Sequence, residues 1–192
     1  KAGKQVITEA EAFIISDILS DNNARADAFG TRSALVIPGR TVAAKTGTTN
    51  DRRDNWTIGW TAGQVTAGVW VGNNDNSPMK ELSSGISGAA PIWRRIMQSA
   101  LRKKPNVSFN VPGGITTAQV DAVSGYPAHD SFPERQEYFI DNTVPTGDDP
   151  IHKNVCGGEY FIIKEEDPTG ANLWQSGIDT WTASQSNPKY HL

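Results

Sequence analysis

The most regular pattern of apolar and polar residues lies near the middle of the chain. Every second residue is apolar over residues 56–60 and again over 65–71, and Ala62-Gly63-Gln64 separates the two runs. Before them, small and β-branched residues at 41–44 lead into Lys45-Thr46-Gly47-Thr48-Thr49, and a charged turn follows at 50–54. Because the side chains of a strand alternate between two faces, this pattern predicts three consecutive antiparallel strands.

Two amphipathic helices are predicted on either side of these strands. The first, over residues 8–22, begins with the capping box Thr8/Glu11 and ends at Asp21-Asn22-Asn23. The second has Pro91 in its first turn, where proline is tolerated, and three basic residues close it at 102–104. Apolar residues recur at helical spacing in both: Ala10, Phe13, Ile14, Ile18 and Leu19, and then Ile92, Trp93, Ile96, Met97, Ala100 and Leu101.

Loops and a change of composition complete the outline. Residues 23–40, which include Phe29-Gly30 and the turn Pro38-Gly39, and residues 73–87 predict loops. Beyond residue 104 the chain is rich in proline, glycine, asparagine and aspartate, with short β-like runs at 115–121, 137–140 and 160–164. We therefore expect a domain over residues 1–104 and a small, irregular, β-rich extension over 105–192.

Composition narrows the classes of protein. The 192 residues include 37% hydrophobic residues and six tryptophans, which predicts a folded domain with room for a small appendage. A net charge of −3 and a pI near 5.6 argue against a general nucleic-acid surface. The chain begins Lys1-Ala2-Gly3, without methionine or signal peptide, so we expect a fragment or a processed piece.

The segment Lys45-Thr46-Gly47 suits an acyl-transfer enzyme that binds an extended peptide ending in a carboxylate. A lysine supplies positive charge, hydroxyl groups donate hydrogen bonds to the carboxylate, and an open strand edge pairs with a peptide backbone. In a strand, Thr46 and Thr48 share one face and Lys45 points to the other. K-T-G is one of three motifs of the active-site serine penicillin-binding proteins and class A β-lactamases.

The similarity extends well beyond the three residues. Residues 45–49, 54–61 and 68–73 and the segment Gly88-Ala89-Ala90-Pro91-Ile92-Trp93 closely resemble the bifunctional (class A) penicillin-binding proteins. The resemblance covers roughly the first half of the chain. It implies an α+β fold of the α/β sandwich type, an antiparallel sheet flanked by helices, of which this chain would be the carboxy-terminal portion of the transpeptidase domain.

The resemblance also implies an activity. Such enzymes cross-link peptidoglycan stem peptides by D,D-transpeptidation through a serine acyl-enzyme, on the outer face of the bacterial cytoplasmic membrane, and β-lactams acylate the same serine. No metal or organic cofactor is implied. Lys45 would hold the substrate carboxylate in a positive field, Thr46, Thr48 and Thr49 would bind it, and Gly47 would allow close approach. The backbone N–H of Thr48 would contribute to the oxyanion hole.

Two other motifs match the family's pattern by accident. Ser77-Pro78-Met79-Lys80 fits S-x-x-K and Ser20-Asp21-Asn22 fits S-D-N. In the family, however, S-x-x-K opens a buried helix far upstream of K-T-G, and S-x-N lies between them. We therefore expect the nucleophile and the S-x-N motif on an amino-terminal part of the same protein, which would also carry the membrane anchor. That part is the expected partner, along with stem peptides and β-lactams.

Two rival functions remain open. The first is a non-catalytic module that binds wall peptide or glycan through the K-T-G strand and the tail residues Trp174 and Trp181. The second is a D,D-carboxypeptidase or β-lactamase-type hydrolase that uses water as the acceptor. Binding without an acyl-enzyme would indicate the former, and free tetrapeptide instead of a cross-linked dimer would indicate the latter.

The remaining polar residues predict no site. His129, His152 and His191 are widely separated and show no metal-ligand spacing, so they are interpreted as loop histidines. The pair Asp148-Asp149 has turn-like neighbours and is interpreted as solvated charge. Cys156 is the only cysteine, which excludes a disulfide within the chain and favours a structural thiol.

Overall fold

A computed structural model describes residues 4–79, 84–155, 158–161, 170 and 172–184. Cys156, Lys80 and His191 lie outside these residues. The chain divides into two compact units, Lys1–Gly113 and Gly114–Leu192, and each is described separately. Sequence analysis placed the boundary after residue 104. Residues 105–113 are counted with the first unit, where Asn106 accepts a bond from the N–H of Thr41 (2.8 Å) and the carbonyl of Pro105 accepts one from Gln64 (3.1 Å).

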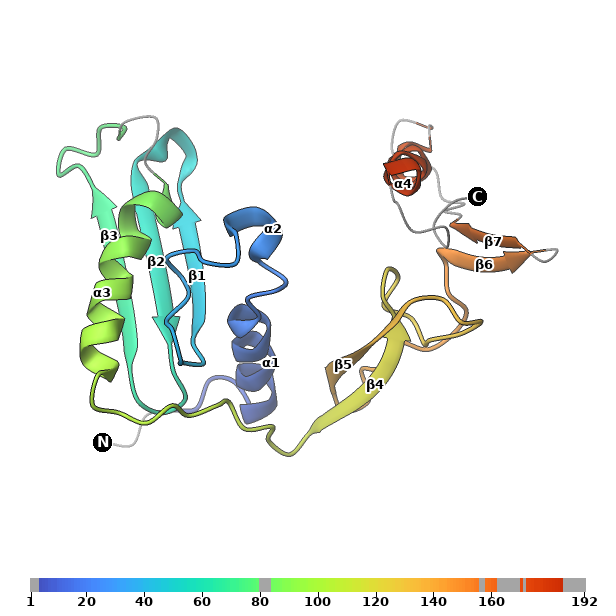
Figure 1. Cartoon of the computed structure of the whole chain (residues 1–192), viewed down its shortest axis with the longest axis horizontal. Coiled ribbons are helices and arrows are strands. Elements are labelled where there is room, and N and C mark those ends of the chain that lie inside the picture. The colour runs from blue at the N-terminus through green and yellow to red at the C-terminus, as the bar shows by residue number, and fades with distance from the viewer. Residues whose placement is uncertain (1–3, 80–83, 156–157, 162–169, 171, 185–192) are drawn as a thin grey trace. The chain divides into compact units, whose positions relative to one another are not determined.

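The first unit is built on an antiparallel sheet with strand order β1-β2-β3 (Figure 1). Its strands are β1 (Ala43–Thr48), β2 (Asp54–Trp60) and β3 (Thr66–Gly72), as the alternating pattern predicted. In the register, Thr46 lies opposite Thr57 and Thr57 opposite Val69. The charged turn between β1 and β2 contains a short 3-10 helix, Asn50–Arg52.

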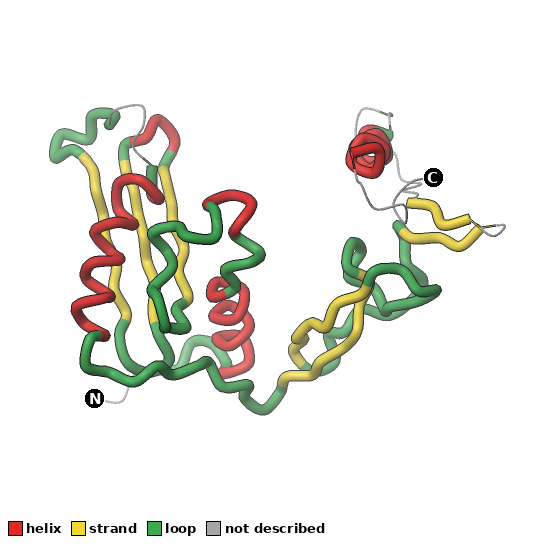
Figure 2. The backbone as a smooth tube through the Cα atoms, viewed as in Figure 1, coloured by secondary structure: helices red, strands yellow, loops and turns green. Residues whose placement is uncertain are grey.

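One face of the sheet packs against α3 (Ala90–Leu101), which has Pro91 in its first turn as predicted. Figure 2 shows that the loop between α2 and β1 crosses the sheet beside α3. Trp93 is fully buried at this interface, and its indole N–H donates to the carbonyl of Ala67 (3.1 Å). The other members of the core cluster are Leu35, Ile37, Val42, Ala44, Val69, Ala89, Ala90, Met97 and Leu101.

Helix α1 (Glu9–Ser20) begins at the predicted capping box. The N–H of Glu11 donates to the Thr8 hydroxyl (3.1 Å), and the N–H of Thr8 donates to the Glu11 carboxylate (2.6 Å). Its predicted buried face is only partly right, because Ile18 is 59% exposed whereas Ser16 is buried. The hydroxyl of the buried Ser16 is satisfied by a hydrogen bond that it accepts from the indole N–H of Trp60 (3.0 Å).

Two segments predicted as loops are partly helical. Residues Ala26–Phe29 form α2, a single turn that ends at Gly30, whose N–H donates to the carbonyl of Ala26 (2.7 Å). The predicted loop 73–87 ends early, because η2, a turn of π-helix over Gly85–Ala89, precedes α3. Ser84 caps this turn through reciprocal bonds with Ser87, a capping box that has no glutamate or glutamine at its third position.

In its described residues, the second unit contains two antiparallel pairs of strands and one helix. Strands β4 (Ile115–Asp121) and β5 (Glu134–Ile140) pair antiparallel, as do β6 (His152–Val155) and β7 (Gly158–Phe161). Sequence analysis predicted β4 at these bounds and β5 in part. The strand-like run that it predicted at 160–164 overlaps the end of β7, and residues 162–164 lie outside the described residues. It missed β6 and α4 (Leu173–Ser184), so the extension is not only β-rich.

Two predictions about polar residues of this unit are wrong. His152 is not a loop histidine, since it opens β6 with 1% of its surface exposed, and Asp149 is buried while Asp148 is exposed. Burial acts to raise the pKa of Asp149, but hydrogen bonds from Ser124, two backbone N–H groups and His129 together lower it below its ordinary value. Asp149 is therefore a buried, hydrogen-bonded carboxylate rather than a solvated charge.

Helices packed on an antiparallel sheet place the first unit in the expected α+β class. No described helix has both the length and the apolar character that a membrane crossing requires.

Candidate functional site

The segment Lys45-Thr46-Gly47-Thr48 forms most of β1, which lies at one edge of the described sheet. Side chains, rather than a further strand, bond two carbonyl groups of this strand: Arg25 Nη1 donates to Ala44 (3.4 Å) and Lys45 Nζ to Thr46 (2.6 Å). Because backbone groups of alternate residues point to the same side of a strand, Ala44, Thr46 and Thr48 turn theirs away from β2.

The backbone of Thr48 therefore faces the edge. Its neighbour Thr49, of opposite parity, donates its N–H across to the carbonyl of Asp54 at the start of β2 (3.0 Å). Gly47 and Lys45 lie opposite Trp56 and Ile58 in the same register. This arrangement directs the N–H of Thr48 outward, where an oxygen atom of a bound molecule can accept it.

The side chains of Thr46 and Thr48 lie on the sheet face that η2 covers. Gly85 bridges two strands there, since its N–H donates to Thr48 Oγ1 (3.0 Å) and its carbonyl accepts a bond from Thr57 Oγ1 (3.1 Å). Thr48 Oγ1 acts as an acceptor in this bond, so its own proton stays free to be donated elsewhere. The bond thus orients the hydroxyl without using its proton.

Lys45 and Gly47 belong to the opposite face of the sheet. Lys45 is exposed, and a β-carbon built at Gly47 would meet only Trp56 Cβ, at an ordinary 3.7 Å. Among the described residues, therefore, nothing requires glycine at position 47.

Thr49 is engaged in the turn rather than along the edge. Its hydroxyl accepts a bond from the N–H of Asp54 (2.9 Å) and lies 3.2 Å from the carboxylate of the same residue. Trp70 Nε1 donates to the other carboxylate oxygen of Asp54 (2.8 Å). The turn from β1 to β2 is thus fixed by side chains of the turn itself, of β2 and of β3.

The two accidental motifs have local hydrogen bonds. Ser77 Oγ donates to Asp75 Oδ1 (2.7 Å) in an exposed loop, and this bond, with one from the Ser77 backbone, lowers the pKa of Asp75. Lys80 of that motif lies outside the described residues. Ser20 Oγ donates to the carbonyl of Asp17 (3.0 Å) at the end of α1. Neither hydroxyl is bonded to a residue of the K-T-G strand in the described part of the chain.

Gly85 is the residue of this region that sequence analysis missed. A β-carbon built there would lie 2.8 Å from the carbonyl oxygen of Gly47, 2.9 Å from that of Trp56 and 3.0 Å from Thr46 Cβ. Two of these atoms belong to the paired backbone of β1 and β2, which cannot move aside locally. The only signal in the sequence was the Ser84-Gly85 pair before the predicted second helix.

We expect Gly85→Ala to lower the free energy of unfolding by about 1–3 kcal/mol, the usual cost of overpacking a close contact. Chemical denaturation of the variant would measure it. Gly113→Ala is the matched control, because a β-carbon at Gly113 meets no atom within 4 Å. Equal stability of the two variants would mean that η2 does not pack closely against the backbone of β1.

The chain is similar in sequence to several penicillin-binding proteins. No protein-family model matches the chain. It is 35% identical over 130 residues to penicillin-binding protein 1A of Pseudomonas aeruginosa, which covers 68% of this chain and 15% of the relative. It is 32% identical to penicillin-binding protein 1A of Escherichia coli, over 73% of this chain and 18% of the relative. It is also 32% identical to penicillin-binding protein 2D of Bacillus subtilis, over 81% and 22%.

A solved structure agrees with these similarities. The crystal structure of penicillin-binding protein 1A from Haemophilus influenzae superimposes with a TM-score of 0.50 at 33% identity, over 56% of this chain and 16% of that one. The matches span 15–22% of the length of the three relatives above. The chain belongs to the class A penicillin-binding protein family.

Proposed function

We propose that this chain supplies the K-T-G strand of a peptidoglycan D,D-transpeptidase whose serine nucleophile and S-x-N motif lie on an upstream part of the protein. The observation that carries the proposal is the edge of β1. There the N–H of Thr48 points away from β2, Lys45 is exposed, and Gly85 orients the Thr48 hydroxyl.

Each group has a role in this chemistry. The serine oxygen attacks the carbonyl carbon of the D-Ala-D-Ala bond, and negative charge develops on the carbonyl oxygen. The N–H of Thr48 and that of the nucleophile stabilise this charge. The positive charge of Lys45 and the hydroxyls of Thr46 and Thr48 bind the terminal carboxylate. D-Ala then leaves, and an amine of a second stem peptide takes the acyl group from the serine.

The partner that we propose is the upstream part of the same protein. Trp56, Ile58 and Trp70 lie on the sheet face of Lys45, and each is 43% exposed. Two residues of α1 are also exposed, Ile15 by 50% and Ile18 by 59%. Apolar surface of this extent is stabilised when another part of a protein covers it. The upstream part would also place the site on the outer face of the bacterial cytoplasmic membrane.

We expect a covalent penicillin adduct only when the upstream part is present. Intact-protein mass after incubation with a penicillin would be compared for this chain alone and for the protein with its upstream part. Peptide mapping should then place the adduct on an upstream serine. An adduct on this chain alone would overturn the proposal and direct attention to Ser77. Binding of D-Ala-D-Ala peptide without any adduct would favour a non-catalytic wall-binding module.

A further inference from the structure

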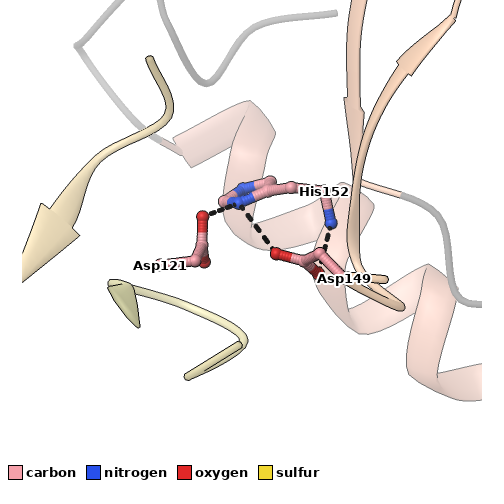
Figure 3. A group of neighbouring side chains, drawn as sticks. All are labelled: Asp121, Asp149 and His152. Carbon is pink, nitrogen blue, oxygen red and sulfur yellow. Dashed lines mark hydrogen bonds and ion pairs between the residues drawn. The ribbon is translucent and has the colours of Figure 1, made fainter. Parts of the chain in front are cut away.

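Three side chains with metal-binding atoms meet inside the second unit (Figure 3). Asp121 is the last residue of β4, His152 is the first residue of β6, and Asp149 lies in the loop that precedes β6. All three are buried, and one ligand atom from each lies within 4.8 Å of the other two. The cluster joins segments that are up to 31 positions apart in the sequence.

Backbone groups orient both carboxylates in the same manner. Oδ1 of Asp121 accepts bonds from the N–H groups of Val123 and Ser124, both at 2.8 Å. Oδ1 of Asp149 accepts bonds from the N–H groups of Ile151 (2.7 Å) and His152 (3.0 Å). Oδ2 of Asp121 contacts His152 Nδ1. Oδ2 of Asp149 accepts a bond from Ser124 Oγ (2.6 Å) and lies 4.0 Å from His152 Nδ1.

The ring of His152 is held in a fixed plane. Phe132 stacks on it with centroids 4.2 Å apart and an interplanar angle of 1°, and His129 meets the edge of Phe132. His129 Nε2 lies 3.2 Å from Oδ2 of Asp149. The ligand atoms and their supports are therefore preorganised by the fold, as the partners around metal sites are.

The charges of the cluster call for a cation. Two carboxylates are buried together, and among the described residues their ion-pair partners are the histidines His152 and His129, while Ser124 gives Asp149 a neutral hydrogen bond. Burying a carboxylate without full compensation costs several kcal/mol. A divalent ion would balance both carboxylates at once with the imidazole neutral.

An entry route is present at one side of the cluster. Asp149 and His152 line a cavity of about 410 Å³ together with His129, Asp130, Asp148 and neighbouring residues. His129 is partly exposed there, with 28% of its side chain accessible. An ion that enters this cavity from solvent would meet Asp149 and His152 at its wall.

We propose that Asp121, Asp149 and His152 bind a divalent transition-metal ion, and that the ion is zinc. Zinc is bound by histidine nitrogen and aspartate oxygen, with four ligands in all, and an imidazole ligand disfavours calcium and magnesium. The fourth ligand is water from the cavity or His129. The ion clamps the end of β4 to the start of β6, so its role is to hold the second unit together.

The test is zinc binding by the full chain after removal of metal by dialysis against a chelator. Isothermal titration with Zn²⁺ and elemental analysis should give one ion per chain. Asp149→Asn keeps the Oδ1 acceptor of the turn and removes the ligand charge. We expect Asp149→Asn to weaken zinc binding by more than about 10–100-fold. That range is the usual effect of losing a residue that only supports a metal ligand by a hydrogen bond. Asp121→Asn should act in the same way.

Asp148→Asn is the matched control, because it makes the same change of charge one position away on an exposed residue. Zinc affinity equal in Asp148→Asn and Asp149→Asn would overturn the proposal, as would a wild-type chain that takes up no zinc. Loss of zinc in Cys156→Ser would also overturn it, by assigning the ion to the thiol. If the aspartate variants fail to fold, the absorption spectrum of the wild-type chain loaded with Co²⁺ tests the proposed ligands. A tetrahedral site with nitrogen and oxygen ligands gives visible bands but no thiolate charge-transfer band, and a charge-transfer band would overturn the proposal.

Discussion

Lys45→Met is expected to slow acylation by penicillin by about 10²–10³-fold in the protein that includes the upstream part, a loss like that of one oxyanion-hole donor. Methionine keeps most of the length of the side chain and removes its positive charge. The substrate carboxylate would then meet Thr46 and Thr48 without a cation beside them. The rate of adduct formation at several penicillin concentrations, followed by intact mass, measures this loss.

Two variants make that result specific. Lys45→Arg keeps the charge and should retain more of the rate than methionine does. Lys103→Met makes the same change of charge on an exposed residue after α3 and should leave acylation unchanged. If Lys45→Met reacts as fast as wild type, the K-T-G strand does not bind the carboxylate, and our proposal for β1 is wrong.

Trp93→Ala is expected to lower the free energy of unfolding of the first unit by about 3–5 kcal/mol, the usual cost of truncating a buried aromatic residue. Trp93 is fully buried between α3 and the sheet, and its N–H bonds the carbonyl of Ala67. The ring also fills the space above Gly59, where a β-carbon would lie 2.4 Å from it. Because natural domains are stable by only about 5–15 kcal/mol, this loss would be a large fraction of the stability of such a domain.

Ile92→Ala provides the comparison, since Ile92 precedes Trp93 on the same helix and is 47% exposed. Urea denaturation followed by circular dichroism should show a small change for Ile92→Ala and a large one for Trp93→Ala. Similar losses in the two variants would place the contact between α3 and the sheet on a different side of the helix.

The sheet and the start of α1 could be predicted because their signals are local. Alternation fixed the three strands, since residues two apart must share a face. The capping box of Thr8 and Glu11 fixed the beginning of α1 within one residue. The K-T-G segment was found as a motif, and its position at one edge of the described sheet is seen only in the structure.

Other features depend on contacts that the sequence does not display. α4 contains Gly177 and several β-branched residues, which have low helix propensity. Its signals were Asn172, whose side chain caps the N–H of Gln175 (3.0 Å), and the spacing of Trp174, Ile178 and Trp181. Sequence analysis assigned Trp174 and Trp181 together to a rival wall-binding module and did not interpret them as one face of a helix.

The buried cluster of the second unit was hidden for a similar reason. Asp149 and His152 are three positions apart, a spacing that can bring two ligands together, but Asp121 joins them only through the fold. Gly85 is comparable, because its tight contact with β1 crosses 38 positions of sequence, from Gly47. Such pairs become visible only when the strands are placed in space.

The order of the strands has a consequence for how the first unit is made. Each strand of the sheet pairs with its neighbour in the sequence, and α3 returns directly onto β2 and β3. Short loops close at small entropic cost, and low contact order favours rapid folding. During synthesis, the sheet of this unit can therefore form within moments of leaving the ribosome. If the upstream part covers Trp56, Ile58 and Trp70 as we propose, it would dock on a face that the sheet has already formed.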